Sequence, residues 1–340
     1  MTSNLGVCTA VSTYSEWNGS AIPPDCWDEY PRLINRGVSQ ATYILWPENP
    51  DELRDIERLA NDAGDEGTGF DELTLRLATP FGERPATPRN FIAQHRAKLL
   101  GVRAQSRFKN RRAYLHSEPN LELAIRDADG NVTGWLMTPE EFLAWYKETL
   151  VLFRAEFPDF EVISPPVAGY DGQAWYWWDK ALRECCALSD LAGVNLYPST
   201  VAELDLGKVP GKDDLAGWSL PWWQGQVDGK KIWVCELGCR TGTPAATRDA
   251  LLPMLWRQTR DCPDVVGSGW FVQWSKGQEH RQHWWTVEQK DELLAVIAEA
   301  PGTAPTTPTT PTPGDTTPPF PPALPVGGKA VYRITVERVE

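Results

Sequence analysis

The chain has 340 residues, of which 41% are hydrophobic, enough for a sizeable core and too many for a disordered chain. Its formal net charge of −13 argues against a nucleic-acid-binding protein, which needs a basic face. No apolar run reaches the roughly 18–20 residues of a membrane span. The first residues have neither a basic stretch nor a long apolar core, so we expect no signal peptide.

Short β-branched or apolar runs alternate with segments of helical periodicity between residues 1 and 300. The runs predict strands at 7–12, 41–46, 72–77, 112–118, 161–167, 192–197, 231–237 and 266–274. N-cap residues placed before a proline predict helix starts at Asn49-Pro50, Thr87-Pro88, Thr138-Pro139 and Thr243-Pro244. Strand and helix alternating over about 300 residues is the pattern of an α/β fold of the (β/α)8 TIM-barrel type.

Two segments fit the capping-box pattern at a helix start, one from Thr138 to Glu141 and one from Thr286 to Gln289. Segment 138–157 then carries one apolar stripe, formed by Phe142, Trp145, Tyr146, Thr149, Leu150 and Phe153. A doubly wound open sheet is the alternative fold. It would be expected to show a glycine-rich phosphate loop after the first strand, and the segment that follows residue 7 is not one.

The C-terminal segment differs in composition from the rest. Residues 301–325 are rich in Pro and Thr and predict an extended linker after a barrel at 1–300. Residues 326–340 contain one alternating segment, 331–339, that predicts a strand. Since a lone strand does not fold by itself, we expect this docking segment to pair with another chain or with the barrel.

The seven cysteines are an odd number without any CxxC pair, so we predict buried structural thiols and no zinc site. We expect neither a metal nor a cofactor. Of the 17 Trp residues, seven cluster in the runs WYWW (175–178), PWW (221–223) and HWW (283–285). Surface aromatics of this kind suit stacking on sugars, but for each single Trp core packing is the favoured interpretation.

Several residues that suit chemistry fall at the carboxyl ends of the predicted strands, where barrel enzymes have their active sites. Trp46, Arg76, Glu118, Tyr197, Glu236 and Trp274 lie at these ends, and His116 lies two residues before Glu118. Two carboxylates on strand ends can converge across the mouth of a barrel. That arrangement is what glycoside hydrolysis by an acid and a second carboxylate requires.

Four motifs, taken in order, resemble one enzyme family. The segment HSEPN (116–120) is similar to the Asn-Glu-Pro acid/base signature on strand 4 of the clan A retaining glycoside hydrolases, a TIM-barrel superfamily of cellulase-like and β-glycosidase-like enzymes. WVCELG, with Glu236, is similar to the nucleophile motif on their strand 7. GVNLYP, with Tyr197, resembles their strand 6, and GWFVQW, with Trp274, resembles their strand 8.

The resemblance implies a retaining enzyme that cleaves β-glycosidic bonds of a poly- or oligosaccharide by double displacement. It implies Glu118 as the general acid/base and Glu236 as the nucleophile. Tyr197 would hold Glu236 ionised and oriented, and Trp274 would stack under the sugar that is cleaved.

Two positions depart from the family. Ser117 stands where the family has an Asn that contacts the sugar 2-hydroxyl, and the predicted second strand lacks the family's Arg. Arg76 is the possible replacement, more as a buried partner of a carboxylate than as a substrate ligand. Trp46 is a further candidate for substrate binding. His116 either lines the sugar site or is a hydrogen-bonded structural residue.

The departures leave a second hypothesis open: a catalytically degenerate barrel that binds carbohydrate and is tethered to a cell surface or virus particle. An extracellular, cell-surface or virion-associated location is favoured over a cytoplasmic one. Other barrel chemistries fit less well. An aldolase needs an inward-facing lysine at a strand end, and a metal-dependent hydrolase needs His/Asp clusters there.

Overall fold

The apolar runs form one eight-stranded parallel sheet, as expected for strands that are buried on both faces. Each predicted strand overlaps one of its members. In sheet order, β7-β4-β3-β2-β1-β10-β9-β8, strands that follow one another along the chain lie side by side. The bounds are β1 (Leu5–Cys8), β2 (Gln40–Leu45), β3 (Glu72–Leu77), β4 (Asn110–Tyr114), β7 (Glu161–Ile163), β8 (Ala192–Leu196), β9 (Ile232–Leu237) and β10 (Val265–Trp270).

The two strands at the ends of this order, β7 and β8, also approach each other. Ile163, the last residue of β7, forms an isolated parallel bridge with Leu191, which directly precedes β8. The backbone N–H of Ser164 donates to the carbonyl of Leu191 at 2.9 Å. The edge strands are therefore joined by backbone hydrogen bonds at their ends.

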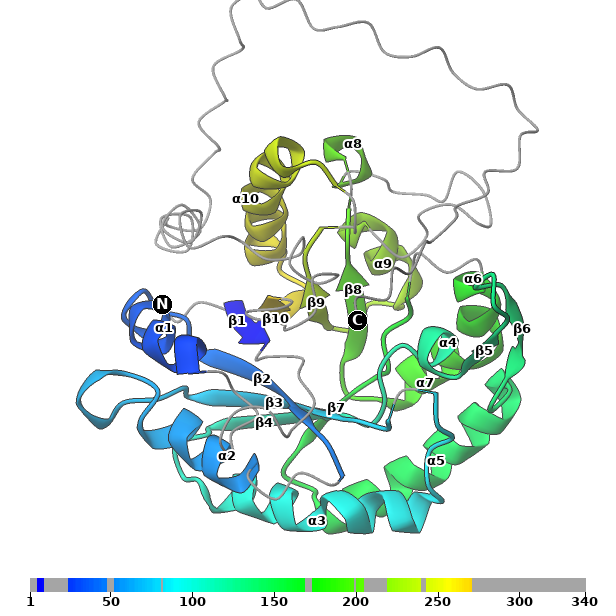
Figure 1. The fold of residues 1–340 in the computed structure, drawn as a ribbon, viewed down its shortest axis with the longest axis horizontal. Coiled ribbons are helices and arrows are strands. Elements are labelled where there is room, and N and C mark those ends of the chain that lie inside the picture. The colour runs from blue at the N-terminus through cyan, green and yellow to red at the C-terminus, as the bar shows by residue number, and fades with distance from the viewer. Residues whose placement is uncertain are drawn as a thin grey trace, which may run out of the picture. The chain divides into compact units, whose positions relative to one another are not determined.

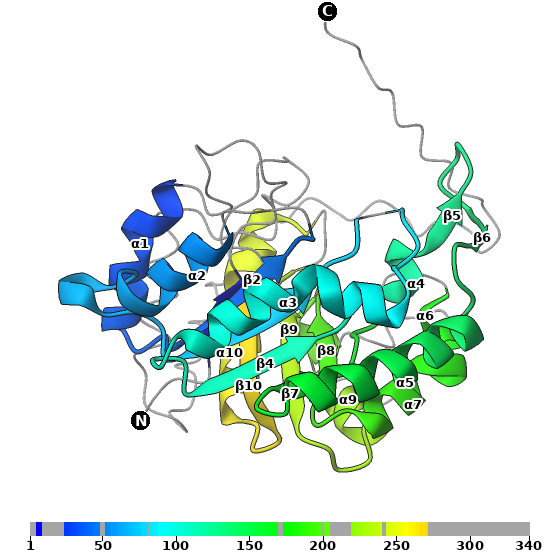
Figure 2. The same ribbon diagram turned by 90° about the horizontal axis from the view of Figure 1, so that it is seen from below.

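Helices lie outside the strands: α3 and α5 cover the outer side of β3, β4 and β7 in both views (Figures 1 and 2). The helical segments are α1 (Pro24–Asn35), α2 (Glu52–Asn61), η2 (Asp65–Gly67), α3 (Pro88–Ala104), α4 (Pro119–Glu122), α5 (Pro139–Glu156), α6 (Ala174–Trp177), η3 (Trp178–Leu182), α7 (Arg183–Leu188), α8 (Val201–Leu204), α9 (Leu220–Gln226) and α10 (Ala245–Asp261).

The predicted capping box at the start of α5 is confirmed. The backbone N–H of Glu141 donates to the Thr138 hydroxyl at 3.3 Å, and the backbone N–H of Thr138 donates to the Glu141 carboxylate at 2.9 Å. The predicted apolar stripe of α5 is buried along its whole length, from Phe142 to Phe153. Local capping and one buried face therefore explain why this segment is a helix.

Core packing is confirmed for four of the clustered tryptophans. Trp177, Trp178, Trp222 and Trp223 are buried, and Trp178 meets Trp223 edge to face with ring centroids 5.0 Å apart. Trp177 packs edge to face on Trp135 and Phe142, so these buried rings stabilise the core and do not form a sugar-stacking surface. Tyr176, in the same run, is exposed.

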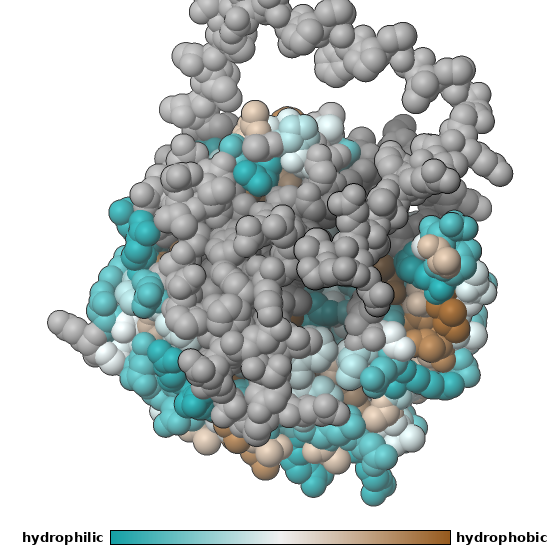
Figure 3. Space-filling model, in the orientation of Figure 1, coloured by the Kyte–Doolittle hydropathy of each residue, from teal (hydrophilic) through white to brown (hydrophobic). Residues whose placement is uncertain are grey.

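Two strand ends and one helix start differ from the prediction. The fourth strand ends at Tyr114 and does not continue to 118, the fifth ends at Ile163 and does not continue to 167, and α10 begins at Ala245 with Pro244 as its N-cap. A short antiparallel hairpin, β5 (Ala124–Arg126) and β6 (Val132–Trp135), was not predicted because its strands are too short to show alternation. In Figure 3 a brown apolar group lies over this hairpin, where Ile125 is exposed.

The structure, a computed structural model, describes residues 5–8, 24–47, 52–80, 82–168, 173–198, 200–204, 219–239 and 243–270. All of them belong to the unit formed by residues 1–303. The predictions for Asn49-Pro50, the Thr286 capping box, Trp274, the linker 301–325 and the segment 326–340 lie outside the described residues.

The two Thr-Pro helix starts allow a test of the capping bond. Thr138 caps α5 through its hydroxyl, whereas Thr87 occupies the same position before α3 without a side-chain capping bond. We expect Thr138→Ala to lower the free energy of unfolding by about 1 kcal/mol, and Thr87→Ala to change it much less. Urea unfolding of both variants measures this. Equal losses in the two variants would contradict the role of the hydroxyl.

Candidate active site

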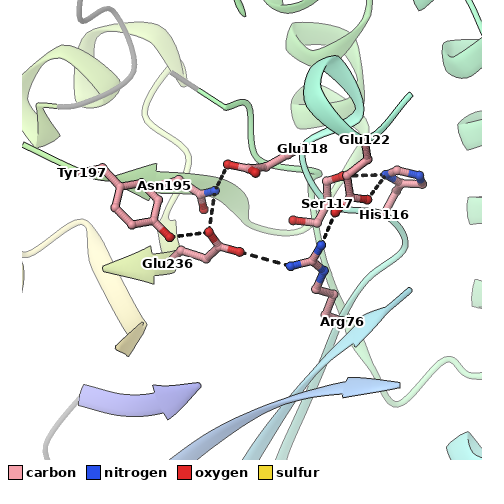
Figure 4. Close-up of polar contacts among 8 residues, drawn as sticks. All are labelled: Arg76, His116, Ser117, Glu118, Glu122, Asn195, Tyr197 and Glu236. Atoms are coloured by element: carbon pink, nitrogen blue, oxygen red, sulfur yellow. Dashed lines mark hydrogen bonds and ion pairs between the residues drawn. The ribbon is translucent and has the colours of Figure 1, made fainter. Parts of the chain in front are cut away.

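Side chains from three strands and one connection converge at the carboxyl ends of the sheet strands (Figure 4). Arg76 comes from β3, Glu236 from β9 and Asn195 from β8, with Tyr197 directly after β8. Glu118 comes from the turn that leads from β4 into α4, and Glu122 is the last residue of α4. Their carboxylates are nearly inaccessible, since Glu118 is 6% exposed and Glu236 is 4% exposed.

The backbone at Glu118 explains how its side chain enters the site. Glu118 is the N-cap of α4, with φ 35° and ψ 56° in the left-handed region that non-glycine residues seldom adopt. This corrects the expectation that Glu118 ends a strand: three residues separate it from Tyr114, the end of β4, and it lies at the start of α4. Pro119 begins α4, where a missing N–H costs nothing. A strained residue of this kind is typical of functional sites.

Asn120 fixes the turn against a neighbouring segment. Its side-chain nitrogen donates to the carbonyl of Ala168 at 3.0 Å, and its side-chain oxygen accepts from the N–H of Ala168 at 2.9 Å. Both bonds are buried. The turn that carries Glu118 is therefore held in place by a two-bond clamp to the segment after β7.

An irregularity in the sheet brings Asn195 and Glu236 side by side. Along β8 and β9, Val194 pairs with Val234, but the next residue, Asn195, pairs with Glu236 and leaves Cys235 as an extra residue. Bulges of this type redirect side chains next to active sites. The two polar side chains therefore point to the same place from adjacent strands.

Glu236 receives bonds from three side chains. The Tyr197 hydroxyl donates to its Oε2 at 2.5 Å, and the Asn195 side-chain nitrogen lies 3.3 Å from the same oxygen. Arg76 Nη1 donates to its Oε1 at 3.2 Å. Hydrogen bonds and a nearby positive charge both favour the ionised form of a carboxylate.

Asn195 also donates to Glu118, at 2.7 Å from Oε1. One amide nitrogen thus bridges the two carboxylates. Because this nitrogen lies 2.7 Å from an oxygen of Glu118 and 3.3 Å from an oxygen of Glu236, these two oxygens are at most about 6 Å apart. The two carboxylates that were predicted to converge are therefore neighbours.

The environment of Glu118 favours its protonated form. Burial raises the pKa of Glu118 well above its usual value, and the negative charge of Glu236 raises it further, while Arg76 opposes this shift. The two carboxyl groups thus differ in their surroundings, although they share Asn195. Glu236 is surrounded by hydrogen-bond donors, whereas Glu118 is buried beside the negative charge of Glu236.

A third buried carboxylate, Glu122, lies on the far side of Arg76. Arg76 Nη2 pairs with Glu122 Oε1, so one guanidinium group contacts both Glu122 and Glu236. Burial raises the pKa of Glu122 to about 7, with Arg76 opposing and Glu236 adding to the shift. Arg76, which was predicted to be a buried partner of one carboxylate, thus pairs with two.

His116 lies behind Glu122. Its Nδ1 donates to the carbonyl of Ser117 at 2.7 Å and lies 3.6 Å from Glu122 Oε2. Its ring packs edge to face on Phe142 and Trp145 of α5, and burial lowers its pKa to about 4. Since β4 ends at Tyr114, strand alternation does not reach this residue, and its ring meets the helix layer.

Two other predicted residues are placed by the structure. Ser117 is buried, and its hydroxyl has no hydrogen-bond partner among the described residues. Trp46 is half-buried directly after β2; its N–H donates to Glu52 at 2.8 Å, and Lys98 donates to its carbonyl. Lys98 and Glu52 also form a buried ion pair at 2.8 Å. The backbone of Trp46 is thus held on both sides.

Sequence reasoning missed Asn195 and Glu122. A signal existed for each. Asn195 stands two residues before Tyr197, which places both on one face of a strand. Glu122 stands four residues after Glu118, one helical turn on, and its N–H donates to the Glu118 carbonyl at 2.9 Å.

Two searches of the described residues gave negative results. Nowhere in the described ranges do three or more His, Cys, Asp or Glu side chains form a group that could hold a metal ion. Among the described helices, none has the length and apolar character needed to cross a membrane. Five described cysteines are free thiols, and four of them are buried.

The fold of this chain is similar to that of solved TIM-barrel glycoside hydrolases. A triple mutant of an endo-β-1,4-glucanase from Xanthomonas axonopodis pv. citri is 14% identical, with a TM-score of 0.56 over 88% of this chain and 100% of that chain. A second endo-β-1,4-glucanase from the same organism is 13% identical, with a TM-score of 0.55 over 88% and 99%.

A glucosidase from Croceicoccus marinus is 13% identical, with a TM-score of 0.50 over 81% of this chain and 61% of that chain. At these identities the similarity shows a common fold. No family model and no curated protein matches the chain.

His116 gives a prediction about acid stability. Its folded-state pKa of about 4 lies below the unfolded value of about 6.5, so between these pH values the unfolded chain binds a proton that the folded protein does not. The wild type should therefore lose about 3 kcal/mol of unfolding free energy, relative to His116→Asn, as pH falls from 6.5 to 4. Urea unfolding at pH 7, 5.5 and 4 measures the difference. A difference that stays constant would contradict a buried neutral histidine.

Proposed function

We propose that this protein is a retaining β-glycoside hydrolase, with Glu236 as nucleophile and Glu118 as general acid/base. The observation that carries the proposal is the Asn195 amide that bridges two buried carboxylates of opposite surroundings. Retaining enzymes have carboxyl groups about 5–5.5 Å apart, against about 6.5–9.5 Å in inverting enzymes. The bound of about 6 Å between the two oxygens supports retention.

The first step is the attack of a Glu236 carboxylate oxygen on the anomeric carbon. The bond from this carbon to the leaving oxygen breaks, and its electron pair goes to that oxygen, which takes the proton of Glu118. The product is a glycosyl ester on Glu236. Donors on Glu236 keep it ionised for attack, and the raised pKa of Glu118 keeps a proton available for the leaving group.

The second step releases the sugar. Glu118, now a carboxylate, takes a proton from water as the water oxygen attacks the anomeric carbon. The ester bond breaks, and its electron pair returns to Glu236. Two inversions give net retention at the anomeric carbon.

We also infer that the sheet closes into a (β/α)8 barrel. The bridge between Ile163 and Leu191 at the edge strands supports closure, as does the similarity to TIM-barrel enzymes. In a closed barrel the carboxyl ends of β3, β4, β8 and β9 face one mouth. Side chains from both halves of the sheet then reach one substrate.

The substrate class that we propose is a β-linked poly- or oligosaccharide. The two endo-β-1,4-glucanases of the same fold make β-1,4-glucan the first substrate to test. The acidic chain is less suited to a strongly anionic polysaccharide. Aryl β-glycosides provide a probe that needs only the subsite of the cleaved sugar.

Glutamine variants test the two roles. We expect Glu236→Gln to lower kcat on all aryl β-glycosides by more than about a thousandfold, because the amide does not form the ester. Glu118→Gln should lower kcat/KM, which reports the first step, by about 10²–10⁴-fold for a poor leaving group and much less for dinitrophenol, which leaves without a proton. The measurements are kcat for Glu236→Gln and kcat/KM for Glu118→Gln over a series of leaving groups.

Glu72→Gln is the matched control, since it removes a carboxylate that pairs with Arg112 at the start of β3. It should leave the rate unchanged. Full turnover by Glu236→Gln would refute the assignment. An α-anomer as the first product in proton NMR would refute retention, and binding of β-glucan without any product would favour a degenerate carbohydrate-binding barrel.

A further inference from the structure

The mechanism above gives no role to Glu122, a buried carboxylate of the candidate active site. Glu122 has a side chain that is 9% exposed, and burying an unneeded carboxylate is costly. It does not contact the bridging Asn195 in any of the hydrogen bonds described for that amide, which go to Glu118 and Glu236. A group of this kind in an active site calls for an account of what its charge does.

Glu122 acts on the site through Arg76. One terminal nitrogen of the guanidinium contacts Glu122 and the other contacts Glu236, so Arg76 lies between the two carboxylates (Figure 4). Arginine stays charged and presents its donors in a fixed plane, which suits it to this double contact. Glu122 and Glu236 therefore share the charge of one guanidinium group.

Charged and titratable groups from several elements lie around Glu122. Arg76 approaches from β3, Glu236 from β9 and His116 from the segment before α4, and Glu118 lies one turn back on the same backbone. Tyr114 of β4 lies near Arg76. Because burial keeps His116 neutral above pH 4, Arg76 carries the positive charge among these described groups near neutral pH.

We propose that Glu122 is a positioning residue that holds Arg76 on Glu236 and, through its own negative charge, extends the protonated range of Glu118 to higher pH. The proposal rests on the function proposed above, in which Glu118 is the proton donor. Glu122 does not touch the reacting atoms in this scheme. It acts through Arg76 and through the field of its carboxylate.

The direction of the effect follows from the charges. Above about pH 7 Glu122 is ionised, and a negative charge next to Glu118 makes loss of its proton more costly. Glutamine at position 122 keeps an oxygen that accepts from Arg76 but removes the charge. More of the positive charge of Arg76 then acts on Glu118, which should lose its proton at lower pH.

The experiment compares Glu122→Gln with Glu72→Gln, which removes a carboxylate from an arginine pair at the opposite end of β3. The pH dependence of kcat/KM is measured on an aryl β-glycoside with a poor leaving group. The alkaline limb should move to lower pH by about one unit in Glu122→Gln and should not move in Glu72→Gln. Glu122→Asp keeps the charge and should retain the wild-type limb.

Loss of a merely structural contact would lower stability or kcat without moving the limb. An unmoved limb in an active Glu122→Gln therefore overturns the proposal and leaves the proposed function intact. A limb that moves equally in Glu122→Gln and Glu122→Asp overturns it as well. If Glu122→Gln does not fold, Glu122→Asn, which also removes the charge, takes its place: a limb at lower pH than in Glu122→Asp supports the role of charge, and an unmoved limb contradicts it.

A second measurement does not depend on turnover. Carboxyl carbon-13 NMR of glutamate-labelled protein follows the titration of Glu118, which Glu118→Gln assigns by the loss of its signal. A fall in its midpoint in Glu122→Gln supports the proposal even if the wild type cleaves no glycoside, in which case the proposed function alone fails. An unchanged midpoint overturns it.

Discussion

The site depends on the ion pairs of one buried guanidinium group, that of Arg76. Three carboxylates are enclosed where the strands of the two halves of the sheet end, and their mutual repulsion would be prohibitive without Arg76, which contacts two of them. Removing one partner of such a buried group costs about 3–5 kcal/mol, because it leaves an uncompensated charge. Arg76 sits in β3, paired with β2 and β4, so its position is fixed by backbone hydrogen bonds on both sides.

The rest of the site divides between rigid and strained backbone. Asn195 and Glu236 are carried by adjacent strands, and a bulge brings them into register. Glu118 is carried by a left-handed turn that the Asn120 clamp holds in place. Strands give precise placement, whereas a tight turn lets a side chain enter the site from an unusual direction. Such a turn persists because its surroundings determine it.

Much of the fold was predictable because its signals are local. Apolar runs marked the eight strands, and the Thr138 capping box marked α5. The site was predictable where a residue type and its place at a strand end were enough, as for Glu236. Glu118 shows the limit: the proline after it indicated a boundary, but its left-handed φ depends on contacts that join residues 120 and 168. The Glu122–Arg76 pair joins positions 46 residues apart and likewise has no local pattern.

The serine at 117 acquires a different meaning once Asn195 is in view. The family that the sequence resembles has an amide directly before the acid, where this chain has Ser117, and the amide that contacts Glu118 here comes from Asn195 of β8. The side-chain nitrogen of Asn195 donates to both carboxylates, and it lies closer to Glu118 than to Glu236. Glu236 is compensated in addition by Tyr197 and Arg76. Three buried carboxyl groups that share one arginine do not all lose their protons. The group that stays protonated is the one whose anion is disfavoured by burial and by two neighbouring negative charges. That group is Glu118, so its preference for the protonated form arises from the neighbours that the fold supplies.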